Sequence, residues 1–203
     1  GDTVFSNKLS FTITSIGFAN KIVYRNKAKL NDDVYVSGNL GDSYLGLLIL
    51  KKKIKLKKSL MKYFTNQYFK PCIQSKLADH IKKFANTSID ISDGLLADLQ
   101  KLINTQKFSY KLYLNKIPIS MNLRKVLNQK NLSKVNYISN GDDYQILFTS
   151  SKNKRGIIKK IASKYRIKLT KIGSIQNLNT KSLLVDYNDK KLSIKNKGYF
   201  HKF

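Results

Sequence analysis

The segment from Ser88 to Leu95 (SIDISDGL) carries the most specific arrangement of chemistry-bearing side chains in the chain. If its first half is extended, Asp90 and Ser92 point to one side of a strand while the isoleucines between them pack behind it. Asp93 then lies where a helix begins, and Gly94 allows close approach of the backbone. Two carboxylates and a hydroxyl at such a junction suit Mg²⁺ and a nucleotide phosphate, because Mg²⁺ prefers carboxylate oxygen and bridges to phosphate. Capping of the helix by these aspartates is the structural alternative.

A second segment has a pattern typical of phosphate binding. A short strand from Asp33 to Ser37 runs into a glycine turn, Gly38 to Ser43, and then into a helical segment from Tyr44 to Phe64. Free amides and the positive end of a helix face such a turn, which favours an anion there. Asp42 or Ser43 as a simple helix cap is the alternative.

The patterns along the rest of the chain predict the elements that must position these residues. Further strands are expected at Lys8 to Phe18, Tyr110 to Leu114, Tyr144 to Thr149, Leu169 to Ile175 and Leu183 to Val185. Further helices are expected at Ile73 to Phe84, Leu95 to Ile103 and Lys154 to Ala162. Such a mixture over 203 residues predicts the α/β class, as an α+β sandwich with a mixed sheet packed with helices.

The charge of the chain raises a polyanion partner as an alternative function. Lys and Arg total 39, acidic residues total 12 with no glutamate among them, and the formal net charge is +27. Only four of the basic residues are arginine, whereas base readout and phosphate clamping favour the guanidinium fork. The lysines are spread over most of the chain and accompany many Asn and Ile residues. We therefore favour compositional drift, and a nucleic-acid partner is not expected.

Cysteine content and hydropathy indicate the compartment. One cysteine, Cys72, excludes a disulfide framework and fits a reducing cytoplasm. The longest apolar stretch, Tyr44 to Leu50, is too short to span a bilayer. The sequence therefore predicts a cytoplasmic protein without a membrane partner.

Several short motifs occur together in one order. They are Gly1-Asp2-Thr3, Arg25-Asn26-Lys27-Ala28, Gly41-Asp42-Ser43, the Asp90 segment, Gly141-Asp142-Asp143-Tyr144 and Gly198-Tyr199-Phe200-His201. In this order and at these separations the set resembles the thiamine-monophosphate kinase family of the aminoimidazole ribonucleotide synthetase superfamily. The resemblance covers essentially the whole chain, but the family has a further N-terminal region of roughly a hundred residues, about one small domain.

The resemblance implies a fold, a reaction and partners. It implies residues 1–30 as the end of the N-terminal ATP-binding domain with its junction, and residues 31–203 as the C-terminal α/β domain that binds substrate and ATP. It also implies ATP-dependent phosphorylation of thiamine monophosphate to the diphosphate, with Mg²⁺ bridging the phosphates, by a homodimer when complete. Since the upstream region holds part of the family's site, we expect no kinase turnover from this chain alone.

The resemblance also implies the roles of individual residues. By motif, the ATP-binding positions are Gly1, Asp2, Arg25 and Ser92. The metal-binding positions are Asp2, Asp90 and Asp93, and the substrate-binding positions are Asp142 and Tyr199. Phosphoryl transfer between phosphate groups needs positioning and charge neutralisation more than a strong base, which agrees with a site made of aspartates.

The chain departs from the family pattern at a few positions. Asn26 and Lys27 replace serine and glycine, Asn140 replaces a glycine, and Asp142 replaces a glutamate. The shorter carboxylate of Asp142 is compatible with contact through water. Another ATP-using synthetase of the same superfamily, a basic nucleic-acid-binding protein and an inactive domain are the alternatives to the kinase.

Overall fold

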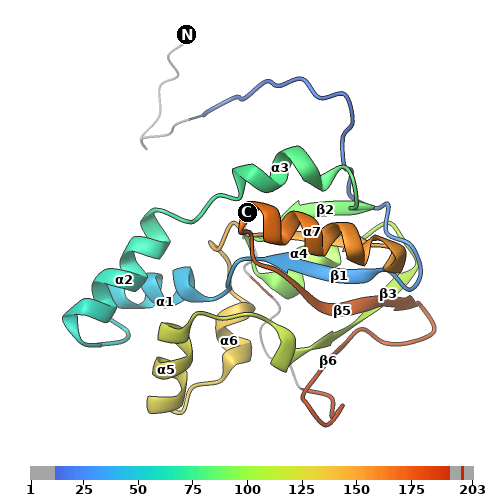
Figure 1. The fold of residues 1–203 in the computed structure, drawn as a ribbon. Helices are drawn as coiled ribbons and strands as arrows, with labels where there is room; N and C mark the ends of the chain where they lie inside the picture. The colour runs from blue at the N-terminus through green and yellow to red at the C-terminus, as the bar shows by residue number, and fades with distance from the viewer. Residues whose placement is uncertain (1–11, 193–197, 199–203) are drawn as a thin grey trace, which may run out of the picture.

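A mixed β-sheet forms the centre of the molecule in this computed structural model, which describes residues 12–192 and 198 (Figure 1). Within the described residues the sheet has six strands in the order β2-β4-β1-β5-β3-β6. The strands are β1 (Asp33–Ser37), β2 (Thr87–Asp90), β3 (Phe108–Tyr113), β4 (Ile146–Ser150), β5 (Leu169–Asn177) and β6 (Leu183–Val185). β3 and β6 pair in parallel, and the pairs β1–β4, β1–β5, β2–β4 and β3–β5 are antiparallel.

Helices connect the strands and cover the sheet. They are α1 (Asp42–Leu50), α2 (Lys58–Phe69), α3 (Ser75–Ile81), α4 (Leu95–Leu102), α5 (Met121–Gln129), α6 (Lys134–Ile138) and α7 (Arg155–Tyr165), with short 3-10 turns at Leu114–Lys116 and Lys152–Lys154. Among the described residues, no helix has the length and apolar character needed to cross a membrane.

The sheet is buried on both faces because its central strands alternate between two apolar clusters. In β1, Val34 and Val36 belong to a large cluster that includes residues of α1, α4 and α5, whereas Tyr35 faces a second cluster shared with α3 and α7. In β4, Leu147 belongs to the large cluster and Phe148 to the second cluster. A strand sends successive side chains to opposite faces, so helices lie on both sides of the sheet (Figure 1). The predicted fold class is confirmed.

The helical segment predicted from Tyr44 to Phe64 is two helices rather than one. α1 ends at Leu50, a lysine-rich turn from Lys51 to Lys57 follows, and α2 packs back on α1. Gly46 makes this possible, because a Cβ atom there would lie 2.2 Å from the carbonyl oxygen of Phe64. Lys51 and Lys55 are four residues apart, as are Lys53 and Lys57, and like charges at this spacing also disfavour a continuous helix through the turn.

The strand predicted from Lys8 to Phe18 is not present over its described part. Residues 12–18 have no regular secondary structure, and residues 8–11 lie outside the described part of the chain. Ile13, Ile16 and Phe18 are exposed. Alternating apolar residues form a strand only where a partner strand and a core accept them, and the described residues supply neither here.

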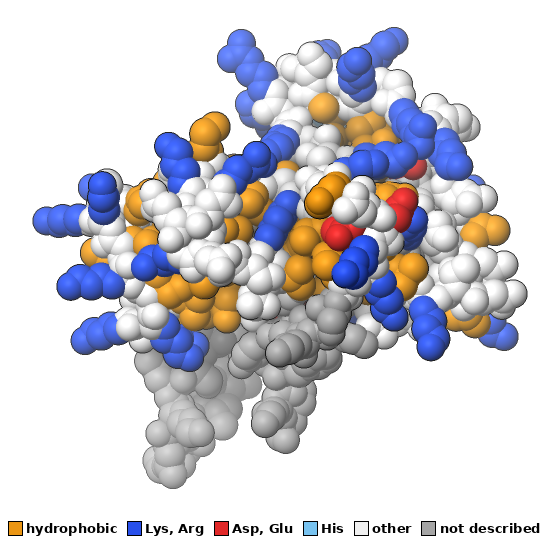
Figure 2. Space-filling view, turned by 90° about the horizontal axis from the view of Figure 1, so that it is seen from below, with side chains coloured by type: hydrophobic (Ala, Val, Ile, Leu, Met, Phe, Trp, Pro, Cys, Tyr) orange, Lys and Arg blue, Asp and Glu red, His pale blue; other side chains and the backbone are white. Residues whose placement is uncertain are grey.

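Basic side chains are distributed, rather than gathered, over the face of the molecule seen in Figure 2. Figure 2 shows lysine and arginine side chains spread over the face seen there, with few acidic ones among them. This distribution agrees with the interpretation of the net charge as compositional drift.

Candidate functional site

A cavity of about 540 Å³ opens where the segment after β2 meets the loop after α6. Its lining brings together three of the residues predicted from sequence: Ser92, Asp93 and Asp142. The other lining residues are Tyr44, Leu47, Lys51, Tyr68, Asn140, Gly141 and Tyr144. The acidic side chains of the lining therefore come from the two loops, and helices α1 and α2 add the aromatic rings of Tyr44 and Tyr68.

Backbone hydrogen bonds hold the two acidic segments side by side. The amide of Ile91 donates to the carbonyl of Gln145 (2.8 Å), the amide of Tyr144 to that of Ile91 (2.9 Å), and the amide of Asp142 to that of Ser92 (2.9 Å). These bonds continue the β2–β4 pairing beyond its last register pair. The position of the Asp142 loop beside Ser92 is thus fixed by the sheet.

Gly141 is required for this approach. A Cβ atom at this position would lie 1.7 Å from the carbonyl oxygen of Ser92, a distance that atoms cannot adopt. Two non-glycine residues of the same loop, Asp142 (φ 67°) and Tyr144 (φ 49°), have left-handed backbone conformations. Such conformations cost of order 1–3 kcal/mol each and often occur at functional sites.

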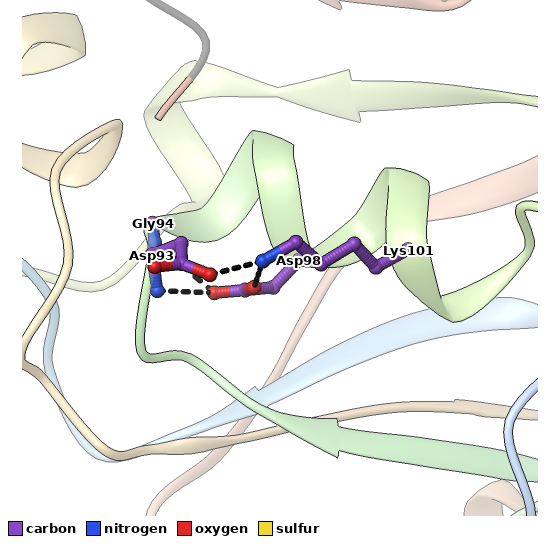
Figure 3. A network of polar contacts seen from close by, with 4 residues as sticks. All are labelled: Asp93, Gly94, Asp98 and Lys101. Carbon is purple, nitrogen blue, oxygen red and sulfur yellow. Dashed lines mark hydrogen bonds and ion pairs between the residues drawn. The ribbon is translucent and has the colours of Figure 1, made fainter. Parts of the chain in front are cut away.

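The turn before α4 is organised by Asp98 rather than by Asp93. The Oδ2 atom of Asp98 accepts hydrogen bonds from the amides of Asp93 (2.9 Å) and Gly94 (3.0 Å), as Figure 3 shows. The Asp98 side chain is buried, and burial raises the pKa of its carboxyl. Because Asp98 satisfies these amides, the carboxylate of Asp93 does not act as the cap that the sequence left as an alternative.

The carboxylate of Asp93 has a cationic partner in the last turn of α4. The ammonium group of Lys101 contacts Asp93 and lies 3.3 Å from Oδ1 of Asp98 (Figure 3). Its hydrogen bond to Asp93 raises the pKa of Lys101. In the neighbouring loop, burial and the charge of Asp93 raise the pKa of Asp142, and the charge of Lys51 opposes the shift. The cavity therefore places two carboxylates where a cation is favoured.

Asp90 is not part of the cavity lining. It is exposed at the end of β2. It lines a separate hollow together with residues 18–23 and residues of α3 and β2. The strand ends at Asp90, so the alternation that would place Asp90 and Ser92 on one side does not continue. The charges of Asp90 and Asp93 both raise the pKa of Tyr144, with burial as the larger cause. Asp90 therefore lies within electrostatic reach of the cavity edge.

The remaining predicted positions lie elsewhere or outside the described residues. Arg25 is exposed, and the next amide, that of Asn26, donates to the carbonyl of Leu102 at the C-terminal end of α4. Gly1, Asp2 and Tyr199 lie outside the described residues. Gly198 is described: a Cβ atom there would lie 2.4 Å from Cβ of Ala97 and 2.9 Å from the carbonyl oxygen of Asp93. Position 198 is therefore packed against the N-terminal turn of α4.

The glycine turn before α1 does not leave a free phosphate cradle. The amide of Gly41 donates to Oδ2 of Asp143 (2.8 Å). Asp42 accepts hydrogen bonds from Ser120 (2.7 Å) and from the hydroxyl of Tyr63 (2.9 Å). The carboxylate of Asp143 thus occupies the amide of Gly41, so the structure does not favour a bound anion at this amide.

The donor set fits Mg²⁺ bound together with phosphates. Among the described residues, no three His, Cys, Asp or Glu side chains form a group that would hold a metal on its own. Mg²⁺ does not require such a cage, because it usually keeps several waters and takes one or two carboxylates plus substrate phosphates. Asp93 and Asp142, on one cavity with the hydroxyl of Ser92, supply such a set.

Sequence reasoning missed several residues of this site. Asp98 and Lys101 organise Asp93, and Lys51, Tyr44 and Tyr68 line the cavity. Asp98 carried a signal, since it lies at the start of a predicted helix and close to Asp93 in sequence. Tyr44 and Tyr68 carried no signal in the sequence, because only the packing of α1 and α2 places them on the cavity lining.

Comparison with known proteins finds similarity to thiamine-monophosphate kinases. The chain is 36% identical over 205 residues to thiamine-monophosphate kinase of Buchnera aphidicola from Acyrthosiphon pisum, covering 99% of this chain and 62% of that protein. It is 32% identical over 155 residues to thiamine-monophosphate kinase of Aquifex aeolicus, covering 76% of this chain and 51% of the relative. The chain is similar to thiamine-monophosphate kinases along nearly its whole length.

The structure supports the same relationship to these kinases. The solved structure of AaThiL complexed with AMPPCP and TMP matches with a TM-score of 0.70 and 29% identity, covering 88% of this chain and 54% of the other. No family model matches the chain. The chain spans less than two thirds of the length of the thiamine-monophosphate kinases described here.

Proposed function

We propose that this chain is part of a thiamine-monophosphate kinase, which transfers the γ-phosphoryl group of ATP to thiamine monophosphate. The observation that carries the proposal is the meeting of Ser92, Asp93 and Asp142 on one cavity, in a chain homologous to these kinases. The complex of AaThiL with AMPPCP and TMP, a structural match to this chain, supports ATP and thiamine monophosphate as the two substrates.

The polar side of the cavity suits the phosphate groups. In the proposal Ser92 donates a hydrogen bond to ATP, Asp93 is a Mg²⁺ ligand, and Asp142 binds the substrate directly or through water. Mg²⁺, when bound, neutralises the charge that builds on the phosphates during transfer. Lys51, on the cavity lining, adds a positive charge on the side where phosphate oxygens lie. These residues position and neutralise, as a transfer between phosphate groups requires.

The aromatic side of the cavity suits the rings of thiamine. Tyr44, Tyr68 and Tyr144 lie on the lining together with Leu47. Aromatic faces attract a cation positioned over them, and the thiazolium ring of thiamine is a cationic aromatic ring. We propose that these tyrosines contact the thiamine rings, together with Tyr199 as implied by the family motif.

The remaining positions complete the proposed site from other parts of the chain. Asp90 is proposed as a second Mg²⁺ ligand, since its charge reaches Tyr144 at the cavity edge. Gly1, Asp2 and Arg25 are proposed to bind ATP, with Asp2 also as a Mg²⁺ ligand. We further propose that residues 1–30 form the end of an ATP-binding domain with its junction, residues 31–203 form the substrate domain, and the complete enzyme is a cytoplasmic homodimer.

The test is turnover by the gene product with any residues encoded in frame before Gly1. We expect conversion of thiamine monophosphate to the diphosphate with ATP and Mg²⁺, measured by chromatography. Asp93→Asn and Asp90→Asn should each lower the rate by orders of magnitude, because a neutral amide is a weak Mg²⁺ ligand. Asp189→Asn is the matched control, since Asp189 is exposed and pairs with Lys111 near β6. Full activity of the Asp93 variant would contradict the assigned role, and diphosphate formation by the 203-residue chain alone would contradict the expectation that its site is incomplete.

A further inference from the structure

Lys101 lies where it competes for the carboxylate at the centre of the site. It belongs to the last turn of α4, and its ammonium group contacts Asp93 and lies 3.3 Å from Oδ1 of Asp98. The three side chains are exposed to different degrees: 40% for Lys101, 17% for Asp93 and 1% for Asp98. Figure 3 shows the ammonium group between the two carboxylates. In this state the carboxylate of Asp93 already has a cation.

The two carboxylates hold Lys101 by different means. Asp98 is fixed, because its Oδ2 atom accepts the amides of Asp93 and Gly94 and leaves Oδ1 for the ammonium group. Asp93 lines the open cavity and has no such pair of backbone bonds to its carboxylate among the described contacts. An ammonium group released by Asp93 would therefore keep its partner Asp98 and remain in contact with water. The exchange requires no change in the backbone.

We propose that Lys101 is an internal counter-ion that a divalent cation displaces from Asp93, so that Lys101 sets the affinity of the cavity for that cation. This inference rests on the proposed function only in taking Asp93 as a cation ligand. An ammonium group is a point charge with three donors, and it satisfies a carboxylate without the directional coordination of a metal ion. In the absence of metal, Lys101 thus lowers the free energy of the charged Asp93 carboxylate. It opposes metal binding by a similar free energy, because the metal ion must displace it.

Lys101 opposes metal binding because of its position beside the carboxylates of the cavity, and not through the net charge of the chain. Asp142 lies on the same cavity, and the charge of Asp93 raises its pKa, so the two carboxylates repel each other. Removing the ammonium group of Lys101 would leave Asp93, Asp98 and Asp142 with less compensation, which favours a divalent cation. Removing a lysine far from the cavity lowers the net charge by the same amount but does not favour a divalent cation in the cavity.

The experiment is titration of the 203-residue chain with Mn²⁺ alone at low ionic strength, with free Mn²⁺ measured by electron paramagnetic resonance. The variant is Lys101→Met, and the matched control is Lys107→Met, an exposed lysine just beyond α4. We expect Lys101→Met to bind Mn²⁺ about tenfold more tightly than the original chain, as loss of one nearby positive charge predicts after screening. Lys107→Met should change the affinity by less than about twofold, since an exposed distant charge is screened. Adding Asp93→Asn to Lys101→Met should remove the gain.

Each other outcome overturns the inference. If Lys101→Met binds Mn²⁺ no more tightly than Lys107→Met, or binds it more weakly, or fails to bind it, then Lys101 does not oppose the cation. Circular dichroism of both variants shows whether the fold is kept, and Lys101→Arg gives a second measurement because it retains the charge and should retain the low affinity. Failure of the proposed function is separate, because it would be seen as missing diphosphate product whatever the Mn²⁺ affinity is.

Discussion

The buried carboxylate of Asp143 accepts a hydrogen bond of 2.8 Å from the amide of Gly41, which lies 102 residues earlier in the chain. This bond connects the N-cap residue of α1 to the loop that carries Asp142. Burial and the charge of Asp42 raise the pKa of Asp143 well above its ordinary value. The contact therefore ties one wall of the cavity to the other at an electrostatic cost.

Asp143→Ala should destabilise the protein and loosen the cavity. The amide of Gly41 would lose its acceptor in a buried position, which costs about 1–3 kcal/mol in the free energy of unfolding. Urea denaturation followed by circular dichroism measures this loss. Asp79→Ala is the control, because Asp79 is exposed on α3. Equal stability of the two variants would show that the Gly41 contact does not stabilise the fold.

Gly141→Ala adds only one methyl group, but it should strongly destabilise the protein. The new methyl group would overlap the carbonyl oxygen of Ser92, so the bond from the Asp142 amide to that carbonyl cannot persist. We expect the free energy of unfolding to fall by at least about 2 kcal/mol, at the upper end of overpacking effects.

Gly156→Ala is the matched control for this substitution. A Cβ atom at Gly156 meets no atom within 4 Å, and the position is in the first turn of α7. Alanine there should leave stability unchanged or raise it by up to about 1 kcal/mol, because glycine is a poor helix former. Urea denaturation of the pair decides the point, and equal midpoints would contradict the steric argument.

The sequence predicts well those elements whose signals are local. β1 and β6 have the bounds that alternation and β-branched residues indicate, and α4 ends one residue before its predicted end. α5 was missed although it carried a signal: Ser120 caps it by accepting the amide of Leu123 (3.0 Å), and apolar residues follow at helical spacing. The structure places Ser92, Asp93 and Asp142, which the family resemblance named, on one cavity, and their roles there stay predictions.

The rest depends on contacts between distant segments. The glycine turn before α1 looks like a phosphate cradle until the carboxylate of Asp143 is placed on it. The lysine-rich stretch after Leu50 looks like the middle of one helix until α2 packs against Gly46. The separation of Asp90 from the cavity depends on where β2 ends, and no local pattern fixes a strand end to one residue.

Lys134 gives a pH-dependent test of the fold that does not involve the site. Its ammonium group donates to the carbonyls of Leu114 (2.7 Å) and Ile117 (2.5 Å), and burial, with the charges of Arg124 and Lys168, lowers its pKa to about 8. The unfolded chain keeps the ordinary value of 10.5, so it binds more protons than the folded chain between about pH 8 and 10.5. Stability contributed by this lysine should therefore rise as pH increases through that window.

The measurement compares the original chain with Lys134→Met by urea denaturation from pH 7 to pH 10. Since the side chain is partly exposed, the stability of the original chain relative to the variant should rise by about 1–2 kcal/mol over this range. The other lysines titrate in both proteins, so the difference isolates Lys134 from the general relief of charge repulsion at high pH. Lys125→Met, at an exposed position of α5, should instead give a nearly constant difference. A Lys134→Met difference that is equally flat would mean that the folded protein does not shift this ammonium group.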